Sequence, residues 1–244
     1  MYNFLKRTLK TLFPNISNKF EFTIRRVLSL FYFGNKVYCG VCESNFKRFI
    51  LLDNAELSCP KCGSLSRQRR MWKFINETIP FKKSDFILHF SPSKILQKKF
   101  KKIYPNYVST DYCGNLKTDK SYDILNIDVA DNSFDIIICY HVLEHIIDDM
   151  KAMSELNRAL KPGGKLIVQT PFKEGGIYED YSITTKEDRL KHFGQDDHVR
   201  IYSVQGLKER LEKVSFNVEV FSFKEAVDNK FGFKPEEHII LCTK

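Results

Sequence analysis

The sequence has no apolar run that approaches the roughly 20 residues a membrane-spanning helix needs. Its beginning also lacks the uninterrupted apolar core and the small-residue cleavage site of a secretory signal. We therefore expect a cytoplasmic protein. With 43% hydrophobic and 28% charged residues the composition is that of an ordinary globular protein, and 244 residues leave room for one sizeable domain and a smaller module.

Acidic residues are scarce in the opening segment, residues 1–36, where Glu21 stands alone against a net charge of +9 for the whole chain. Leucines and a phenylalanine lie between the basic residues of this segment, which are Lys6, Arg7, Lys10, Lys19, Arg25, Arg26 and Lys36. This pattern predicts a basic amphipathic leader that contacts an anionic membrane, at the inner face of the bilayer. The alternatives are a solvated helix docked on the domain and a frayed terminus.

Four of the seven cysteines form two C-x2-C pairs separated by sixteen residues: Cys39 and Cys42, then Cys59 and Cys62. This spacing is typical of a four-cysteine zinc site, so residues 37–83 are predicted to be a zinc ribbon with a linking helix. Four thiolates leave no coordination position for water, which indicates a structural zinc ion. Chance pairing of the cysteines is the alternative, and a cytoplasmic setting argues against disulfides.

Arginines cluster directly after the second cysteine pair, in the run from Ser66 to Lys73 that also holds the one tryptophan. One interpretation is a basic helix face that binds phosphate or nucleic acid. The other is structural: Arg67, Arg69 and Arg70 pair with acidic residues of the ribbon or of the main domain.

A βαβ unit stands at the centre of the remaining chain. Phe134–Tyr140 is a β-branched apolar run typical of a strand buried on both faces, and a helix with Asp148 as N-cap follows it. Lys161-Pro162-Gly163-Gly164 ends that helix, and a second buried strand covers 165–169. Polar side chains gather after the first strand, from Tyr140 to His145, at the sheet edge where α/β proteins bind ligands.

The run FDIIICYHVLEH, followed by a helix and LKPGGKLIV, resembles the fourth strand, fourth helix and fifth strand of class I S-adenosylmethionine-dependent methyltransferases. The resemblance implies an α/β fold with a Rossmann-like, doubly wound, seven-stranded sheet over residues 84–244. Its other strands are expected at 85–90, 107–110, 121–125, 216–223 and 238–242, the last antiparallel between the fifth and sixth. Together with the ribbon and FGQxDHVR, the pattern looks like a bacterial group of zinc-ribbon methyltransferases of type 11.

The same resemblance implies a site for S-adenosylmethionine along the strand ends. Ser91-Pro92-Ser93 replaces the usual glycine-rich loop, His89 stands where an acidic residue is expected, and Ser91 is expected to cap the following helix. Asp111 is expected to bind the ribose hydroxyls, and Asp123 with Ile124 the adenine, with Asp128 as a competitor of Asp123. The expected cofactor-binding residues are His89, Phe90, Ser91, Asp111, Tyr112, Asp123, Ile124, Tyr140 and His141.

A polar insertion at about 172–202 collects His, Asp, Arg and Tyr residues after the fifth strand. Methyl transfer to a hydroxyl needs a base, and imidazole is the usual one. We expect His198 in this role, then His141, with His145 also a candidate and with Glu144 or Asp197 as orienting partners. Glu144 alone could simply cap a helix.

Three functions follow from these patterns. The first is O-methylation of a sugar or surface-glycan precursor, which the association of similar enzymes with surface-polysaccharide assembly suggests and which a membrane-facing leader would suit. The second is RNA methylation, prompted by the ribbon and the arginines. The third is a non-catalytic binding protein that keeps the fold, prompted by the glycine-less first loop.

Overall fold

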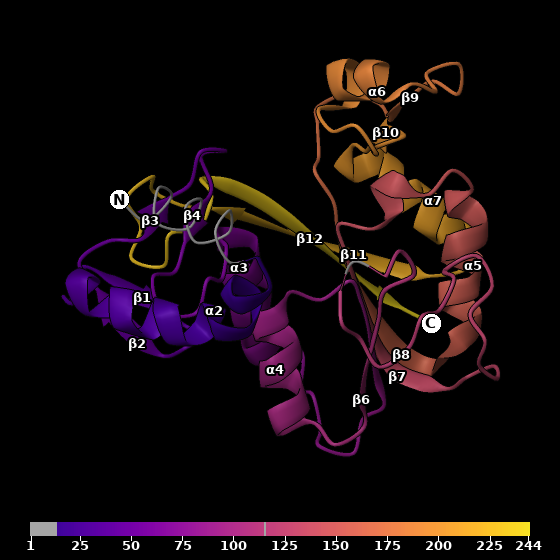
Figure 1. The fold of residues 1–244 in the computed structure, drawn as a ribbon. Coiled ribbons are helices and arrows are strands. Elements are labelled where there is room, and N and C mark those ends of the chain that lie inside the picture. The colour runs from indigo at the N-terminus through magenta and orange to yellow at the C-terminus, as the bar shows by residue number, and fades with distance from the viewer. Residues whose placement is uncertain (1–13, 115) are drawn as a thin grey trace. The chain divides into compact units, whose positions relative to one another are not determined.

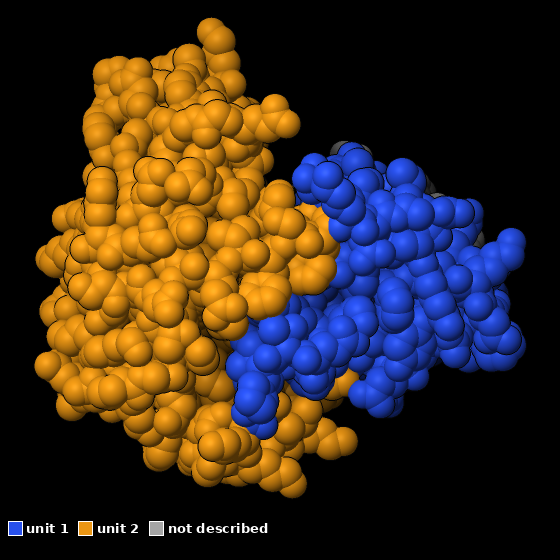
Figure 2. Space-filling model, turned by 180° about the vertical axis from the view of Figure 1, so that it is seen from behind, with its two compact units in different colours: residues 1–81, 224–236 blue, residues 82–223, 237–244 orange. Residues whose placement is uncertain are grey.

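The computed structural model describes residues 14–114 and 116–244, with side chains from residue 21 onward. The chain forms two compact units (Figure 2): unit 1 holds residues 1–81 and 224–236, and unit 2 holds 82–223 and 237–244. Unit 1 thus takes in a loop that the sequence analysis assigned to the methyltransferase domain. The Lys6 to Phe13 part of the expected leader lies outside the described residues.

Unit 2 is built on one mixed sheet whose strand order is β11-β12-β8-β7-β5-β6 (Figure 1). Its four central pairings put β5, β6, β7 and β8 parallel to one another and β12 antiparallel to β8. The last strand therefore inserts next to the fifth, as expected for the class I methyltransferase fold. The strands are β5 (Ile87–Phe90), β6 (Tyr107–Thr110), β7 (Phe134–Tyr140), β8 (Leu160–Gln169), β11 (Asn217–Lys224) and β12 (Glu236–Thr243).

The expected strand at 121–125 does not form, so the sheet has six strands among the described residues instead of seven. The loop before it already occupies the open edge of β6: the amides of Asp119 and Lys120 both donate to the carbonyl of Ser109, and Thr110 pairs with Lys120 as a single bridge. The Asp123 carboxylate then accepts from the Leu125 amide, 2.9 Å away. Aspartate in this role favours a turn over an extended strand.

Helices cover both faces of the sheet. Helix α5 (Asp149–Ala159) and helix α7 (Val204–Lys213) pack their apolar stripes on the face that carries Leu88 and Val168. Helix α4 (Lys94–Ile103) covers the opposite side of β5, where Phe100 packs against His89. Asp148 caps α5 by accepting from the Lys151 amide, as predicted.

The cap of α4 differs from the prediction. Ser93, and not Ser91, is the N-cap residue, because Ser91 adopts a left-handed backbone with φ of 44° and lies two residues before the cap. The Ser91 hydroxyl instead donates to Asp111 at 2.9 Å. Ser91 therefore belongs to the strand-end loop and not to the helix.

The insertion after β8 folds as a short antiparallel pair, β9 (Tyr178–Glu179) with β10 (Arg200–Ile201), and helix α6 (Lys186–Phe193) lies between them in sequence. Thr185 caps α6, and Gly194 ends it in the left-handed conformation. The insertion is thus an ordered part of unit 2 that ends directly before α7.

From residue 14 onward, unit 1 contains two α-helices, a 3-10 helix and two hairpins. Its elements are α2 (Pro14–Ser29), the 3-10 helix η1 (Leu30–Tyr32), β1 (Val37–Cys39) paired with β2 (Ser44–Phe46), β3 (Ile50–Leu51) paired with β4 (Leu57–Ser58), and α3 (Ser66–Thr78). The loop 224–236 completes the unit, since the Tyr38 amide donates to the carbonyl of Lys230. Gly232 comes so close to the Phe49 ring that a Cβ would lie 2.4 Å from it.

The arginines of α3 are structural. Arg69, 2% exposed, donates to the carbonyls of Leu57, Ser64, Phe231 and Gly232. Arg70 is equally buried, and its guanidinium lies 2.6 Å from the Glu225 carboxylate and 3.7 Å above the Phe233 ring. Arg67 pairs with Glu56, so Arg67 and Arg70 bind acidic residues as the structural interpretation states, whereas Arg69 binds backbone carbonyls.

Within residues 14–114 and 116–244, no helix has the length and apolar character that crossing a bilayer requires.

Replacing Arg69 with Met should lower the free energy of unfolding of unit 1 by about 3 kcal/mol or more, because four loop and strand carbonyls lose their donor. Arg67→Met is the matched control on the same helix: its partly exposed ion pair with Glu56 is worth about 1 kcal/mol at most. Urea denaturation followed by tryptophan fluorescence measures both, since Trp72 lies in α3. Equal losses in the two variants would contradict the role given to Arg69.

Candidate functional site

The four cysteines of the two C-x2-C pairs converge in unit 1, with their sulfur atoms within 4.8 Å of one another. Cys39 Sγ lies 3.7 Å from Cys62 Sγ, and Cys42 Sγ lies 3.7 Å from Cys59 Sγ. A tetrahedral zinc ion with Zn–S bonds of about 2.3 Å requires sulfur–sulfur distances of about 3.8 Å. The cluster therefore has the dimensions of a four-thiolate zinc site.

The surroundings of the sulfurs also suit a metal. The Ser64 hydroxyl lies 3.3 Å from Cys39 Sγ and 3.2 Å from Cys62 Sγ, where it can donate to a thiolate and orient it. Burial raises the pKa of Cys59 far above its ordinary value, so this thiol needs a cation beside it to ionise. Because all four positions are thiolates, the chemistry of the donor set is structural and leaves no place for a substrate.

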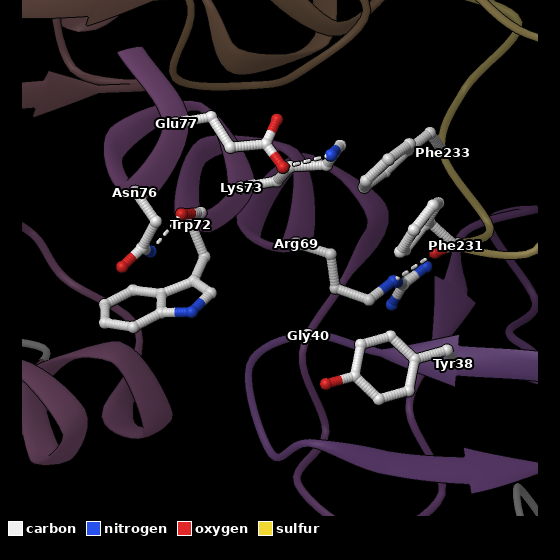
Figure 3. Close-up of a pocket in the computed structure, with 9 residues that line it drawn as sticks. All are labelled: Tyr38, Gly40, Arg69, Trp72, Lys73, Asn76, Glu77, Phe231 and Phe233. Atoms are coloured by element: carbon white, nitrogen blue, oxygen red, sulfur yellow. Dashed lines mark hydrogen bonds and ion pairs between the residues drawn. The ribbon is translucent and has the colours of Figure 1, made fainter. Parts of the chain in front are cut away.

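Unit 1 also contains a pocket of roughly 200 Å³, shown in Figure 3. The rings of Tyr38, Trp72, Phe231 and Phe233 line it together with Lys73, whose ammonium group pairs with Glu77. Ligand pockets usually measure about 300–1,000 Å³, so this one is too small for a nucleotide. Arg69, which Figure 3 shows turned towards Phe231, is occupied by backbone carbonyls and offers no phosphate site.

In unit 2 the candidate site lies at the carboxyl ends of β5, β6 and β7. The strand order reverses between β5 and β7, which makes this the switch point where open α/β sheets bind ligands. The residues after both strands, Ser91 and His141, have left-handed backbones with φ of 44° and 54°. A left-handed backbone costs a non-glycine residue roughly 1–2 kcal/mol, and such strain concentrates at functional sites.

Asp111 lies beside Ser91 on this rim and is buried. One carboxylate oxygen accepts from the Ser91 hydroxyl and the other accepts from the Leu116 amide at 3.1 Å. The structure therefore brings together two of the expected cofactor-binding residues, from β5 and β6. Tyr112, the next residue, is exposed in the loop that follows.

The segment that carries the adenine candidates is tied to the same rim. The Tyr122 amide donates to the Thr110 side chain at the end of β6, which places Asp123 near the rim, half-buried. Ile124 lies in the core. The competitor Asp128 is exposed, and Arg158, near the far end of α5, holds the carbonyls on either side of it. The placement thus favours Asp123 over Asp128.

Two expected cofactor-binding side chains point into packed interior instead. His89 is buried between α4 and β6, where it contacts the Tyr107 hydroxyl and packs edge-on against Phe100. Burial lowers the pKa of His89 to about 3, so the ring is neutral and cannot replace an acidic residue. Phe90 belongs to the core on the opposite face of the sheet. Only the backbone of these two residues is available to a ligand at the rim.

The predicted catalytic residues form one cluster next to the switch point. His141 Nδ1 lies 3.1 Å from Glu144 Oε1, and His145 Nδ1 lies 3.3 Å from Asp197 Oδ2. The rings of His145 and His198 meet edge to face, with centroids 4.7 Å apart. The insertion after β8 therefore brings Asp197 and His198 to the loop after β7, as the sequence analysis required.

Arg200 holds this arrangement in place, and the sequence analysis did not assign it a role. Its fully buried guanidinium donates to the carbonyls of Leu143, Ile146 and Ile147 in the loop after β7, and to the Glu179 carboxylate. The signal was present in the run Asp197-His198-Val199-Arg200, whose arginine follows the histidine by two residues on a strand. Arg200 positions the cluster without being one of its titrating groups.

Comparison with known proteins gives a match to the family model described as "Methyltransferase domain" over residues 89–219. An uncharacterized protein of Methanocaldococcus jannaschii is 38% identical over 85 residues, which cover 33% of this chain and 37% of that protein. A probable S-adenosylmethionine-dependent methyltransferase of Mycolicibacterium smegmatis is 31% identical over 100 residues, covering 40% of this chain and 34% of the relative. The chain thus spans little more than a third of the length of these curated relatives.

Solved structures resemble this chain over a larger share. A SAM-dependent methyltransferase from Archaeoglobus fulgidus matches with a TM-score of 0.51 at 16% identity, over 72% of this chain and 93% of the other. An S-adenosylmethionine-dependent methyltransferase from Mesorhizobium loti matches with a TM-score of 0.50 at 14% identity, over 71% and 97%. At such identities the likeness concerns the fold.

Replacing Cys62 with Ser should remove one equivalent of zinc per chain and unfold unit 1, because three thiolates close the tetrahedral site poorly. Cys113→Ser is the control, since this cysteine is exposed and outside the cluster. Zinc is measured by mass spectrometry of the purified protein, and folding by near-ultraviolet circular dichroism. The same zinc content in both variants, or disulfides between the four cysteines, would contradict the zinc site.

Proposed function

Because this chain belongs to the methyltransferase domain family, as the match over residues 89–219 shows, we propose that it transfers a methyl group from S-adenosylmethionine to a hydroxyl group. The observation that carries the proposal is the rim at the switch point. There a buried carboxylate, Asp111, and two strained strand ends, Ser91 and His141, lie at the carboxyl ends of neighbouring strands, and His141 belongs to the cluster of histidines. Bound S-adenosylmethionine would supply an activated methyl group at this edge.

The residues at the rim fit this cofactor. The two oxygens of Asp111 suit the two hydroxyls of a ribose, and the hydroxyl that now binds one of them belongs to Ser91, which can rotate away. The amino-terminal end of α4 carries the positive end of the helix dipole, which favours the carboxylate of the methionine moiety nearby. The Ser93 hydroxyl at that end is buried and has no hydrogen-bond partner among the described residues, which leaves it available to a ligand.

A hydroxyl acceptor must lose its proton as the new bond forms. In the reaction the acceptor oxygen bonds to the methyl carbon, the carbon–sulfur electron pair leaves on sulfur, and the hydroxyl proton passes to a base. His141 fits the base best: its Nδ1 contacts Glu144, which orients the ring, and its Nε2 is buried without a hydrogen-bond partner among the described residues. His198, the stronger candidate from sequence, lies farther into the cluster.

We propose a sugar or glycan precursor on a lipid carrier as the acceptor. Unit 1 supports a membrane-facing role, because apolar side chains gather at the end of α2 and beyond it. Val27, Leu30, Phe31 and Phe33 are 57%, 73%, 62% and 81% exposed. Exposed basic residues stand beside them, and Lys47 and Arg48 lie over the Tyr32 ring. Apolar residues among basic ones suit the interface of an anionic bilayer.

RNA as the acceptor is less well supported. The three arginines of α3 that suggested it are engaged by Glu56, by Glu225 and by backbone carbonyls. A phosphate backbone would find no free guanidinium there. Affinity for RNA that falls steeply with salt concentration would favour this alternative.

Replacing Asp111 with Asn should weaken the binding of S-adenosylhomocysteine about 10- to 100-fold, because a charged acceptor of ribose hydroxyls is lost while the shape is kept. Asp128→Asn, at the exposed competitor, should bind like the original protein. Isothermal titration calorimetry measures the dissociation constant of S-adenosylhomocysteine for the original protein and for both variants. Equal affinities for the two variants would reject the role of Asp111. Failure of the unsubstituted protein to bind at millimolar cofactor would favour a non-catalytic protein.

Replacing Phe31 and Phe33 together with Ser should weaken binding to vesicles that contain phosphatidylglycerol by about tenfold or more, since each phenylalanine loses its transfer into the interface. Val227→Ser is the control: Val227 is 81% exposed, as Phe33 is, but lies in the loop 224–236. Co-sedimentation with vesicles gives the bound fraction. Binding that is indifferent to anionic lipid, or unchanged in the double variant, would exclude this surface.

A further inference from the structure

We propose that Glu144, His145 and His198 bind a divalent transition-metal ion, separate from the zinc of the four cysteines. One ligand atom from each of these side chains lies within 4.8 Å of the others. Two imidazoles and one carboxylate are the ligand set of many catalytic metal centres. This inference rests on the proposed function, because it describes how the same rim would activate the acceptor.

The Glu144 carboxylate gives the first indication. It is 1% exposed; Oε1 contacts His141, while Oε2 is buried and has no hydrogen-bond partner among the described residues. A buried carboxylate oxygen without a partner costs free energy of folding, and a bound cation usually compensates this cost. Since Asp197 adds a second carboxylate to the cluster, the local charge also favours a cation.

The two histidines are prepared to act as ligands. Asp197 Oδ2 lies 3.3 Å from His145 Nδ1, so this carboxylate can orient the ring, as carboxylates do for metal-binding histidines in general. The His198 side chain is buried, which limits the conformations open to its ring. The edge-to-face contact of the two rings brings their edges close together.

The backbone holds the three residues together. Glu144 and His145 belong to the 3-10 helix η2 (Leu143–His145), and the carbonyl of Glu144 accepts from the amide of Val199, next to His198. Arg200 ties the same loop to β10 from the other side. Such rigid support is what a metal centre needs to hold its geometry.

Nitrogen and carboxylate donors suit Zn²⁺, Co²⁺, Mn²⁺ or Fe²⁺ better than Mg²⁺, which prefers oxygen ligands only. Three protein ligands leave coordination positions open. An acceptor hydroxyl bound there would have its pKa lowered, as that of zinc-bound water falls to about 7, and its proton could then pass to His141. His198 would accordingly be a ligand and His141 the base.

The test is the amount and the type of metal bound by the full-length protein. After equilibration with Zn²⁺ and removal of excess, we expect two ions per chain in the original protein and one in Glu144→Gln and in His198→Asn. His192→Asn is the matched control in the same insertion: His192 is exposed and bonds to Tyr178, so this variant should keep two ions.

Co²⁺ is then added to protein whose four-cysteine site already holds Zn²⁺, so that any Co²⁺ spectrum reports on the second site alone. We expect weak visible bands without sulfur charge transfer, and Co²⁺ binding at least about 100-fold weaker in Glu144→Gln and His198→Asn. One ion per chain in the saturated original protein, or unchanged Co²⁺ binding in both variants, would overturn the proposal. Calorimetry with S-adenosylhomocysteine on the same samples reports cofactor binding separately, and thermal unfolding identifies any variant that fails to fold.

Discussion

Backbone carbonyls that turn away from water must be paired, and in each unit one buried arginine supplies the donors. In unit 2, Arg200 binds three carbonyls of the loop after β7 and so joins the insertion to the sheet edge. In unit 1, Arg69 binds four carbonyls and so joins the loop 224–236 to the ribbon. A guanidinium has five donors in a fixed plane, which lysine cannot reproduce. The loop after β7 and the loop 224–236 depend on these two side chains.

The candidate site follows from the first of these connections. The loop after β7 carries His141, Glu144 and His145, and the insertion carries Asp197 and His198. Neither segment would hold its side chains in one arrangement alone, because irregular backbone has many accessible conformations. Arg200, with Glu179 and the nearby Asp149 carboxylate, restricts both of them to one arrangement. This explains how the polar insertion at 172–202 can be well packed beside the rim.

The first loop shows how the fold tolerates the loss of its glycines. The backbone at Ser91 adopts the left-handed conformation that glycine would take without strain. The serine hydroxyl recovers part of that cost through its hydrogen bond to Asp111. The backbone at this rim thus takes the conformation of a glycine-containing loop, although the sequence lacks the glycine-rich pattern. The absence of the glycine-rich motif in this loop is therefore weak evidence against a cofactor site.

Much of the fold was predictable because its signals are local. The apolar run at 134–140 and the cap at Asp148 each act within a few residues, and both predictions are confirmed. The strand expected at 165–169 also forms, but β8 already begins at Leu160, so the residues Lys161 to Gly164 lie within the strand and not before it. The cysteine spacing likewise predicted a convergence that the structure shows. The prediction of a strand at 121–125 was wrong, since residues 117–120 occupy the edge of β6 instead. This competition depends on distances in three dimensions that no local sequence pattern records.

The sequence by itself determined which residue types stand at the strand ends, because alternation and helix caps place those ends within one or two positions. Only the tertiary structure decided which of them meet. His89 turned inward with the pleat of the sheet and Ile124 packed into the core from a turn. His198 reached Glu144 across more than fifty residues, where the Val199 amide donates to the Glu144 carbonyl. Arg69 and Arg70 became structural for the same reason, because some of their partners come from the loop 224–236. Contacts between distant segments depend on packing and on the pairing of buried polar groups, which a linear pattern does not encode.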